Sequence, residues 1–552
     1  MTSRKRVFIG TAWPYANGSL HFGHVASLIG GDILARYHRQ RGDEVLFVSG
    51  SDCHGTPIAV EAIKQGVKPE EIASHYHEEF THNLIDGLGF SYDLYTKTTT
   101  PFHKKTVQDI FLQLHRKELI YSKPQNLPFC PSCNRFLPDR YIEGECPKCG
   151  FSPARGDQCD NCGNLLDPIQ LVNPVCKICG KTPEWRESEH FFLKLSAFTD
   201  RLHEFVASQS ESWRLNAAKF TAGLLKEGLI DRAITRDTDW GVEVPLAGYE
   251  NKRIYVWFEA VCGYFSASKE WAELKGQPDD WKSYWQEECW HYYVHGKDNI
   301  PFHTIIWPAI LIGYGGLNLP NQIVSSEFLN LEGRQFSKSR KWAAWIPDFL
   351  RSFNSESLRY YLIASGPETS DSSFSWKEFQ SRNNNELIGT FGNFIHRVLS
   401  FIQRDFGGVV PRTSQDTGSS HLLTEVNHAY TQVGKLIEGA KFREALREVF
   451  RLAEEGNRDI NKTAPWVKIR AGKKEEAGDV LGAYVQVIDN LRVLCSPFLP
   501  KTGQSLAKIL GSTDFNWNIK EPLSDKKIQQ PIPLFNKIED DVIRAEIERL
   551  GK

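Results

Sequence analysis

The sequence predicts an α/β protein in which a doubly wound parallel sheet is followed by an all-helical C-terminal region. Short apolar runs at residues 7–9 and 45–48 flank a segment with helical spacing, which indicates a strand, a crossover helix and a second strand. From about residue 376 onward, apolar residues recur only at helical spacing. Between residues 121 and 186, a segment rich in Cys, Pro and Gly interrupts the sheet-forming part.

Length and composition limit the class of protein. A chain of 552 residues holds about three or four domains, and 41% hydrophobic with 24% charged residues is ordinary for a globular protein. The net charge of −2 gives no overall attraction to nucleic acid, so any RNA contact needs local basic patches. The sequence has no signal peptide and no apolar run of roughly 18 residues, so we expect a cytoplasmic protein without a membrane span.

Two histidines stand where the first crossover helix begins. His21 and His24 are three residues apart and therefore share one face of the helix, beside unpaired N–H groups that favour phosphate oxygens. Gly23 has no side chain to keep a planar ring or a ribose away from the backbone. This pattern indicates a nucleotide site; the alternative is that the two imidazoles only cap the helix.

An acidic residue follows the second predicted strand. Asp52 lies in a turn at residues 49–57, and ligands of doubly wound sheets lie beyond the carboxyl ends of the strands. We therefore expect Asp52 to enter the same crevice as the two histidines. The alternative is that Asp52 caps the next helix.

Eight of the twelve cysteines form four C-x-x-C pairs within fifty residues. Each pair forms a tight knuckle with two thiolates, and two pairs complete a tetrahedral Zn²⁺ shell, so we expect two structural zinc ions. We favour a nested arrangement, in which the second and third pairs form an inner site and the first and fourth an outer site. Consecutive pairing and disulfides are the alternatives. The eight residues are Cys130, Cys133, Cys146, Cys149, Cys159, Cys162, Cys176 and Cys179.

A second motif, Phe-Ser-Lys-Ser at residues 336–339, lies in a loop flanked by Gly and Arg. Together with residues 21–24 it resembles the two nucleotide motifs of class I aminoacyl-tRNA synthetases, and residues 12–18 resemble the methionyl-tRNA synthetases in particular. The resemblance implies a Rossmann-type catalytic domain that makes methionyl-adenylate and pyrophosphate from methionine and ATP. The methionine is then transferred to the 3′-terminal adenosine of tRNA(Met).

The resemblance implies that His21, His24 and Lys338 act on the departing pyrophosphate. Developing negative charge is stabilised by cations and donors that are in place as the bond breaks. The family usually has a second lysine where this chain has Gln335, so one of its two cations is missing here. Neighbouring basic residues that could substitute are Arg334, Arg340 and Lys341.

The resemblance also implies contacts to both small substrates. Gly296 and Asp298 would let the adenosine approach and would bind its ribose, while Gly23 and Lys338 would also contact ATP, with which Mg²⁺ is expected. An aromatic slot suits a thioether, because each sulfur–ring contact contributes roughly 0.3–1.5 kcal/mol. The methionine contacts would be Ala12, Trp13, Tyr15, Asp52, Arg236, Trp257, Ala260, Tyr264 and His303.

Within that set, Asp52 would take the ammonium group of methionine, and Arg236 would reach its carboxylate and the nucleotide. The alternative for Arg236 is a surface ion pair with a neighbouring aspartate. The apolar run at residues 254–260 predicts that a strand of the sheet resumes there. Trp257 and Tyr264 would share a helix face only if a helix began at Trp257.

The helical region contains one strongly amphipathic segment at residues 387–402. Asn393 and Arg397 project from its polar face, and Trp466 could stack on an unpaired base for about 1–3 kcal/mol. These three residues match the anticodon-reading positions of the family. The alternative is an ordinary solvated helix face.

The resemblance covers nearly the whole chain and implies tRNA(Met), methionine and ATP as partners. No further dimerisation domain follows, so we expect a monomer. The rivals are a sister synthetase for leucine, isoleucine, valine or cysteine, and a zinc-knuckle RNA-binding protein without catalysis. The expected regions are 1–120 and 236–328 for the two catalytic halves, 121–235 for the zinc-containing insertion, 329–380 for the second motif and stem-contact region, and 381–552 for the anticodon-binding domain.

Overall fold

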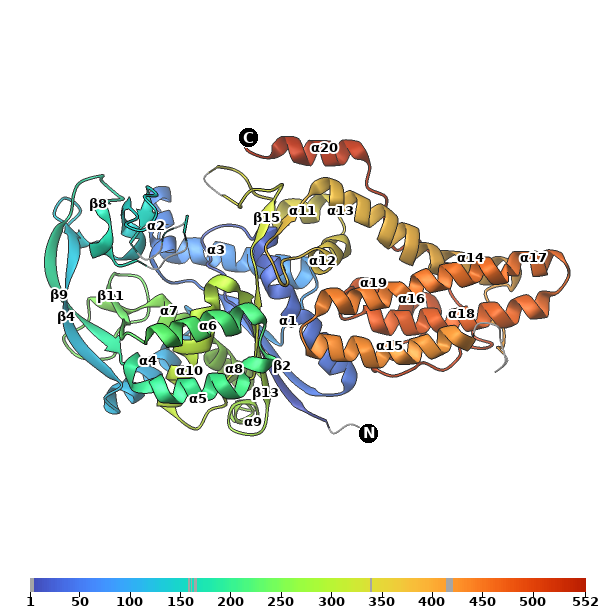
Figure 1. The fold of residues 1–552 in the computed structure, drawn as a ribbon, viewed down its shortest axis with the longest axis horizontal. Coiled ribbons are helices and arrows are strands. Elements are labelled where there is room, and N and C mark those ends of the chain that lie inside the picture. Colours follow the sequence, from blue (N-terminus) through green and yellow to red (C-terminus); the bar gives the residue numbers. More distant parts are fainter. Residues whose placement is uncertain (1–3, 157–158, 160, 163–165, 338–339, 414–419) are drawn as a thin grey trace.

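A five-stranded parallel sheet forms the centre of the N-terminal half (Figure 1). The computed structural model describes residues 4–156, 159, 161–162, 166–337, 340–413 and 420–552. The order of the strands is β14 (Gln322–Ser326), β13 (Trp290–Gly296), β1 (Arg6–Thr11), β2 (Glu44–Ser51) and β3 (Leu94–Lys97). All four pairings are parallel, so the predicted α/β fold is confirmed. The order reverses between β1 and β13, which is where such sheets bind ligands.

Helices cover both faces of this sheet, and alternate residues of β1 enter two different cores. Val7 and Ile9 pack on the side of α1, whereas Phe8 packs with α4, α8 and α10 on the other side. The predicted strand, helix and strand unit is therefore present as β1, α1 and β2. The helices around the sheet are α1 (Phe22–Arg41), α2 (Thr56–Gln65), α3 (Pro69–Thr81), α4 (Pro101–Arg116), α8 (Gly263–Leu274) and α10 (Trp307–Tyr314).

The strand predicted at residues 254–260 is wrong. Strand β12 (Lys252–Ile254) pairs with β11 (Thr235–Asp237) in a separate antiparallel ribbon, and helix α7 (Val256–Val261) begins almost at once. A short run that is apolar throughout cannot be distinguished from a buried helix by periodicity. The helix brings Trp257 and Ala260 to one end of the sheet.

The insertion extends from the sheet on a long antiparallel ribbon of β4 (Ile120–Cys130) and β9 (Glu184–Leu193), at the left of Figure 1. Strands β5 (Arg135–Phe136) and β10 (Arg232–Ala233) complete this sheet. A smaller sheet of β7 (Ala154–Arg155), β6 (Ile142–Glu145) and β8 (Val172–Cys176) holds the metal-rich segment. Helices α5 (Thr199–Gln209) and α6 (Leu215–Glu227) then return to the catalytic half.

The C-terminal half is an elongated group of helices, at the right of Figure 1. Helix α18 is buried along most of its length, so the other helices pack around it. The helices are α14 (Asn393–Asp405), α15 (Ser420–Glu438), α16 (Phe442–Thr463), α17 (Pro465–Arg470), α18 (Lys474–Cys495) and α19 (Pro500–Leu510). In the part of the chain that the structure describes, no helix has the length and apolar character that crossing a membrane requires.

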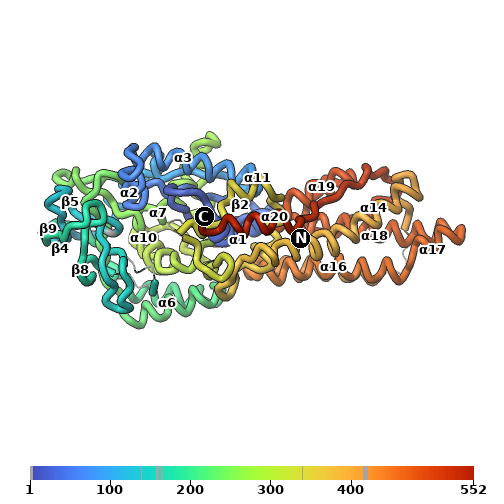
Figure 2. Tube along the Cα trace, turned by 90° about the horizontal axis from the view of Figure 1, so that it is seen from above, coloured from blue at the N-terminus to red at the C-terminus, as the bar shows by residue number. Residues whose placement is uncertain are grey.

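A connecting region joins the two halves. Strand β15 (Leu329–Leu331) pairs with β16 (Ser372–Phe374), and helices α11 (Ile346–Ser352), α12 (Ser355–Ala364) and α13 (Trp376–Arg382) surround them. The last helix, α20 (Asp540–Arg549), returns from the helical half to lie against α13 (Figures 1 and 2).

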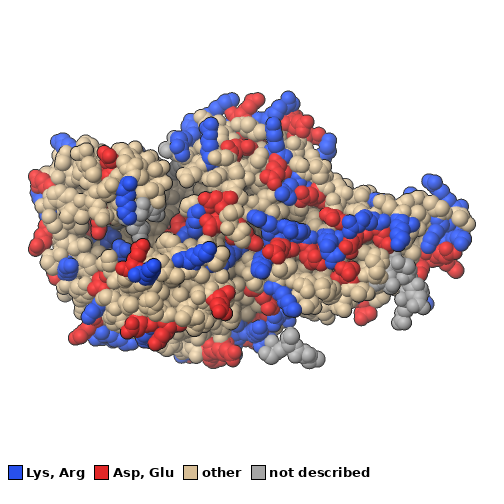
Figure 3. All heavy atoms as spheres, viewed as in Figure 1, with Lys and Arg blue, Asp and Glu red and all other residues tan. Residues whose placement is uncertain are grey.

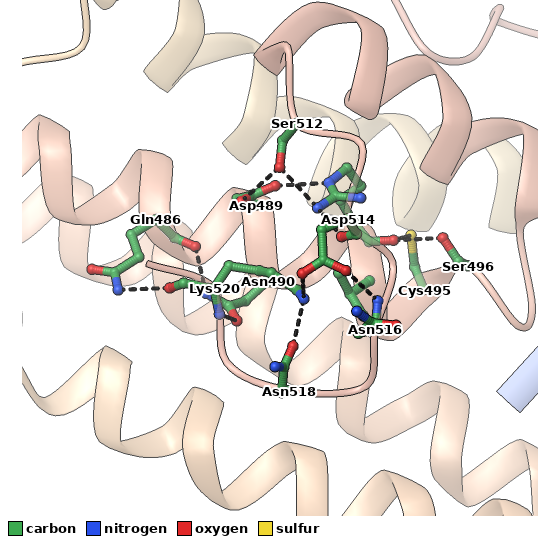
Figure 4. Close-up of polar contacts among 12 residues, drawn as sticks. Gln486, Asp489, Asn490, Cys495, Ser496, Ser512, Asp514, Asn516, Asn518 and Lys520 are labelled. Carbon is green, nitrogen blue, oxygen red and sulfur yellow. Dashed lines mark hydrogen bonds and ion pairs between the residues drawn. The ribbon is translucent and has the colours of Figure 1, made fainter. Parts of the chain in front are cut away.

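Polar side chains of α18 fix the segment that follows α19 (Figure 4). The fully buried guanidinium of Arg492 donates to Asp489 at 2.7 Å and to the Ser512 hydroxyl at 3.0 Å. In the same segment, Trp517 lies at the end of α1, and its backbone N–H donates to the backbone carbonyl of Gln40 at 2.7 Å. The helical half is therefore bonded directly to the helix that carries His21 and His24.

Candidate active site

The segments that follow β1 and β2 are hydrogen-bonded to each other at the carboxyl ends of these strands. The N–H of Ala12 donates to the Val294 carbonyl of β13 at 2.9 Å, so the chain continues along the switch between β1 and β13. The backbone of Asp52 donates to the Pro14 carbonyl at 2.9 Å and accepts from the N–H of Ala16 at 2.8 Å. Asp52 therefore lies at this edge, and Gly55, not Asp52, is the N-cap residue of α2.

The first motif caps helix α1 with its own imidazoles. Nδ1 of His21 accepts from the N–H of Gly23, and Nδ1 of His24 accepts from the N–H of His21, both at 3.1 Å. Because both Nδ1 atoms accept, each neutral ring carries its proton on Nε2, which is a donor. Burial, and then the charge of His24, lowers the pKa of His21 well below its usual range; burial lowers the pKa of His24 to about 4. The rings cap the helix and each still carries an Nε2 donor.

The second motif lies on the first. The Phe336 ring stacks on the His21 imidazole with centroids 4.4 Å apart and planes 6° from parallel. Beyond the loop, the N–H of Ile346 donates to the carbonyl of Leu20 at 2.8 Å. The structure therefore brings together the two motifs that the sequence separates by about 300 residues.

Lys338, the predicted cation of the second motif, lies outside the described residues. Among the described residues of this motif, the backbones of Ser337 and Trp342 exchange two hydrogen bonds of 2.9 Å. Gln335 is exposed, and the guanidinium of Arg334 lies 4.7 Å from the ring centroid of Trp342.

The residues predicted for the aromatic slot lie on helices α7 and α8, on the π-helical turn η7 (Phe302–Ile306) and on the segment after β1. The ring of Trp257 stacks on Phe302 at 4.1 Å and meets Tyr15 edge-on at 6.2 Å. Tyr264 and His303 are buried, and the Tyr264 hydroxyl lies 2.7 Å from Nε2 of His303. Nδ1 of His303 lies 2.9 Å from the Asn299 carbonyl and donates to it, so Nε2 accepts from the tyrosine.

The Trp13 ring packs against two glycines, Gly50 near the end of β2 and Gly263 at the start of α8. A Cβ atom on Gly50 would lie 2.6 Å from the Trp13 ring, and one on Gly263 would lie 2.8 Å from it. Close approach of the ring therefore requires both glycines. Ala12 and Ala260 are partly exposed; Ala12 directly precedes Trp13, and Ala260 follows Trp257 by three residues.

Asp52 is almost fully buried. Burial, followed by the charge of Glu259, raises the pKa of the Asp52 carboxyl well above its usual range, although the N–H of His54 donates to it at 3.2 Å. A cation at this position would reverse the shift, because it favours the carboxylate. The site therefore suits an ammonium group.

Arg236 lies over the ring of Tyr255, with its guanidinium carbon 3.7 Å from the ring centroid. It also donates to the carbonyls of Ala233 and Thr235, at 3.1 and 2.9 Å. Both aspartates of the alternative are engaged elsewhere: Asp237 pairs with Lys252 and His190, and Asp239 with Arg135. Its role toward methionine stays a prediction.

The Gly-Lys-Asp turn follows β13 at the switch. A Cβ atom on Gly296 would lie 2.8 Å from an oxygen of Asp298, so a side chain there would displace the Asp298 carboxylate. The Asp298 carboxylate is exposed and accepts from the Asn299 amide at 3.2 Å. Lys297 points away to Glu327 and Asp371, with ion-pair distances of 2.8 and 2.6 Å. Asp298 is thus placed at the sheet edge, beside the aromatic slot.

The eight cysteines form two groups of four, as the nested arrangement predicts. The ligand atoms within each group lie within 4.8 Å of one another. The sulfur atoms of Cys130 and Cys179 in the outer group lie 3.5 Å apart, and those of Cys149 and Cys159 in the inner group lie 3.6 Å apart. A disulfide has a bond length of about 2.05 Å, so these are thiols. Four sulfurs at this spacing fit a tetrahedral zinc ion.

The three predicted anticodon residues also come together, at the far end of the helical half. The amide of Asn393 donates to Asn457 at 3.2 Å, and the guanidinium of Arg397 donates to Asn461 at 2.9 Å. The same guanidinium lies 5.5 Å from the ring centroid of Trp466. Helices α14, α16 and α17 thus present one polar and aromatic surface.

Basic and acidic side chains alternate over the helical half on the face shown in Figure 3. Arg451, for example, pairs with Glu425 at 2.8 Å and with Glu448 at 2.6 Å. Such pairing leaves little net field on this face, so recognition of RNA there would depend on specific contacts more than on long-range attraction.

Comparison with known proteins identifies the family. A family model described as "tRNA synthetases class I (M)" matches residues 7–399, and a second one, described as "Anticodon binding domain of methionyl tRNA ligase", matches residues 410–551. A methionine–tRNA ligase of Dehalococcoides mccartyi is 50% identical over 99% of this chain and 100% of its own length. One from Bacillus mycoides is 47% identical over 99% of both chains. The chain belongs to the methionyl-tRNA synthetases.

The fold agrees with this assignment. The methionyl-tRNA synthetase of Mycobacterium tuberculosis, solved in complex with methionyl-adenylate, has a TM-score of 0.80 to this chain. The similarity covers 96% of this chain and 99% of that chain at 23% sequence identity.

The sequence analysis missed several residues of these sites. His54, His103 and Glu259 form a buried cluster beside Asp52, and Asn457 and Asn461 contact the predicted anticodon residues. One signal was available: Glu259 is the only charged residue in the apolar run at 254–260. An isolated charge in such a run is buried only when it has a partner.

Proposed function

We propose that this chain ligates methionine to tRNA(Met) in two steps, through methionyl-adenylate. The observation that supports this most is the contact between the two nucleotide motifs, Phe336 on His21, at the same sheet edge as the aromatic slot and Asp52. Phosphate donors, a thioether pocket and a carboxylate for an ammonium group are therefore neighbours.

In the first step, the methionine carboxylate attacks the α-phosphorus of ATP, its oxygen–phosphorus bond forms and pyrophosphate leaves. ATP enters as its magnesium complex. The Nε2–H groups of His21 and His24 donate to phosphate oxygens, and Lys338 neutralises the charge on the leaving group. Because no covalent enzyme intermediate is needed, positioning supplies most of the rate.

Methionine is held at both ends. Asp52 accepts from its ammonium group, and the slot of Trp13, Tyr15, Trp257 and Tyr264 surrounds its thioether. Ala12, Ala260 and His303 complete the walls of the pocket, and Arg236 moves from Tyr255 to the carboxylate end. Gly23, Gly296 and Asp298 take the adenosine.

In the second step, the terminal adenosine of the tRNA displaces AMP from the adenylate, while the anticodon lies on the helical half. Asn393 and Arg397 bind base edges, and Trp466 stacks on one base. Zinc would be held by the two cysteine groups, where it supplies structural stability and no chemistry, since all four positions of each site are filled by thiolates. We expect a monomer in a reducing compartment such as the cytoplasm, which keeps these thiols available.

Exchange of labelled pyrophosphate into ATP tests this function. Methionine should stimulate the exchange, and leucine, isoleucine, valine and cysteine should not. Stimulation by one of those amino acids instead would identify a sister enzyme. An absence of stimulation by any amino acid, with tRNA binding intact, would identify a binding protein without catalysis.

A further inference from the structure

Three buried ionisable side chains lie beneath the candidate methionine pocket and have no part in the steps above. His54 follows β2, His103 lies in α4 and Glu259 lies in α7; their exposed fractions are 1%, 0% and 0%. Oε1 of Glu259 lies 2.5 Å from Nδ1 of His54 and 3.3 Å from Nε2 of His103. We call these three residues the buried acid cluster.

The orientation of the cluster is fixed by its neighbours. The Ser266 hydroxyl donates to the Gly263 carbonyl at 3.1 Å, so it accepts from Nδ1 of His103 at 2.9 Å. The His54 ring meets Trp240 edge-on at 5.1 Å. Burial alone raises the pKa of the Glu259 carboxyl, but His54 and His103 outweigh it and lower that pKa to about 2. Glu259 is therefore a carboxylate in the protein interior.

Each member of the cluster is attached to a different wall of the candidate pocket. His54 bonds with its side chain to Glu259 and with its backbone N–H to Asp52, at 3.2 Å. Glu259 stands in α7 between Trp257 and Ala260, and the His103 ring lies 5.9 Å from that of Trp13. A chain of contacts thus runs from Glu259 through His54 to Asp52.

We propose that Glu259 is a positioning residue for the ammonium group of methionine, because through His54 it fixes the Asp52 carboxyl beside which that group binds. This inference rests on the proposed function. Without the carboxylate of Glu259 the His54 side chain loses its charged acceptor, and a neutral amide in its place would support Asp52 and α7 less firmly. Buried hydrogen bonds to charged groups are the strong ones, so we expect a clear effect on binding.

The proton that Asp52 releases when methionine binds provides a second measurement that tests the proposal. An ammonium group beside Asp52 favours its carboxylate, so methionine binding releases a proton near and below the raised pKa of Asp52. Removing the Glu259 charge should move this release to lower pH. The other titratable groups that act on the cluster or on its neighbours are Cys53, Lys97, Lys104 and Cys262.

Two ligands separate an ammonium effect from a general effect on the pocket. L-Methioninol keeps the ammonium group and lacks the carboxylate, whereas 4-(methylthio)butanoate keeps the carboxylate and the thioether but lacks the ammonium group. In Glu259→Gln we expect the KM for methionine and the Ki of methioninol to rise about 10- to 100-fold. The Ki of 4-(methylthio)butanoate and the KM for ATP should stay within about twofold.

Glu356→Gln is a matched control, since Glu356 is a buried glutamate of α12 that accepts from the N–H of Thr502, away from the pocket. It should leave both inhibition constants unchanged. Equal weakening of both inhibitors by Glu259→Gln, or no weakening of either, would overturn the proposal. Calorimetry in buffers of different ionisation heat should show the proton release shifted to lower pH in this variant.

If Glu259→Gln does not fold, His54→Ala is the second test, because it breaks the side-chain link to Glu259 and leaves the backbone donor to Asp52. It should weaken methioninol selectively, and unselective weakening would again overturn the proposal. The two hypotheses fail in different ways. A wild-type chain without methionine-dependent exchange contradicts the proposed function; normal wild-type exchange with variants unaltered contradicts only the role of Glu259.

Discussion

The rings of Phe336 and His21 are stacked 4.4 Å apart and 6° from parallel, although the two residues belong to motifs at opposite ends of the catalytic half. The His21 ring also stacks on His24, with centroids 3.8 Å apart. The loop of the second motif is thus seated on the pair of imidazoles that we assign to phosphate, and its position and theirs are linked.

Replacing Phe336 with Ala should therefore loosen the loop. An aromatic pair contributes about 0.5–1.5 kcal/mol, which corresponds to roughly a 2- to 10-fold loss of kcat in pyrophosphate exchange. Phe336→Met, which keeps a large apolar side chain on the His21 ring, should recover most of the rate. Unchanged exchange in the alanine variant would mean that the stack does not hold the loop during the reaction.

Lys338→Ala should depress adenylate formation strongly, by about 100-fold or more, because a cation at the departing phosphate is lost. Affinity for tRNA should remain nearly intact. Pyrophosphate exchange and filter binding of tRNA(Met) measure the two effects separately. Lys377→Ala, at an exposed lysine of α13, is the control, and an equal loss of exchange and tRNA affinity in Lys338→Ala would contradict the assigned role.

The structure also predicts acid sensitivity from buried histidines. His291 is fully buried on β13, its Nε2 lies 2.7 Å from the Tyr284 carbonyl, and burial lowers its pKa to about 4. In the unfolded chain the pKa is about 6.5, so between these values the unfolded state binds the extra proton. The contribution of the neutral histidine to the free energy of unfolding is therefore fully present above pH 6.5. By pH 5 the free energy of unfolding has fallen by on the order of 2 kcal/mol for each such histidine.

Thermal unfolding at pH 7, 6 and 5 measures this effect. The midpoint should fall with pH, and it should fall less in His291→Gln, which keeps a donor for Tyr284 but does not titrate. A variant that follows the wild type in parallel at every pH would show that His291 does not bind the proton on unfolding.

Much of the fold follows from periodicity and from residue chemistry. The β1–α1–β2 unit was predictable because two short apolar runs, at residues 7–9 and 45–48, flank a segment with helical spacing. The grouping of the cysteines could be favoured from the sequence because the number and spacing of the thiols allow few arrangements. Helix α7 was mistaken for a strand since its residues are nearly all apolar, and period 2 and period 3.6 then give the same pattern.

The buried acid cluster could not be predicted in the same way. His54, His103 and Glu259 are separated by 49 and 156 residues in the sequence, and only the folded topology brings them together. The contact of Phe336 with His21 could not be predicted either, since it depends on how the chain folds back onto α1.

The two metal groups should differ in their effect on catalysis. Both groups share a small core with Ala59 of α2, the helix that begins four residues after Asp52, but only the outer group includes a residue of the long ribbon, Cys130 at the end of β4. Cys176→Ser and Cys159→Ser should each lower the metal content from two zinc ions per chain to one. Only Cys176→Ser should raise the KM for methionine, by about tenfold, or ~1.4 kcal/mol.

Metal analysis and pyrophosphate exchange on the same preparations check both statements. A content of two ions in either variant would contradict the four-cysteine assignment of that group. Equal KM values for methionine in the two variants would show that the outer group does not support the methionine pocket more than the inner group does.

Trp466 gives the clearest test of the helical half. Its ring lies near parallel to Phe401 at 6.0 Å and close to Arg397, which keeps it ordered at the surface. Trp466→Ala should raise the KM for tRNA(Met) in the charging reaction about 10- to 100-fold, the equivalent of a base stack of 1–3 kcal/mol. Val467→Ala, at the neighbouring exposed position, should not. Methionine-dependent exchange should be unchanged in both variants because it involves no tRNA, so a Trp466→Ala enzyme that charges normally would remove this surface from anticodon recognition.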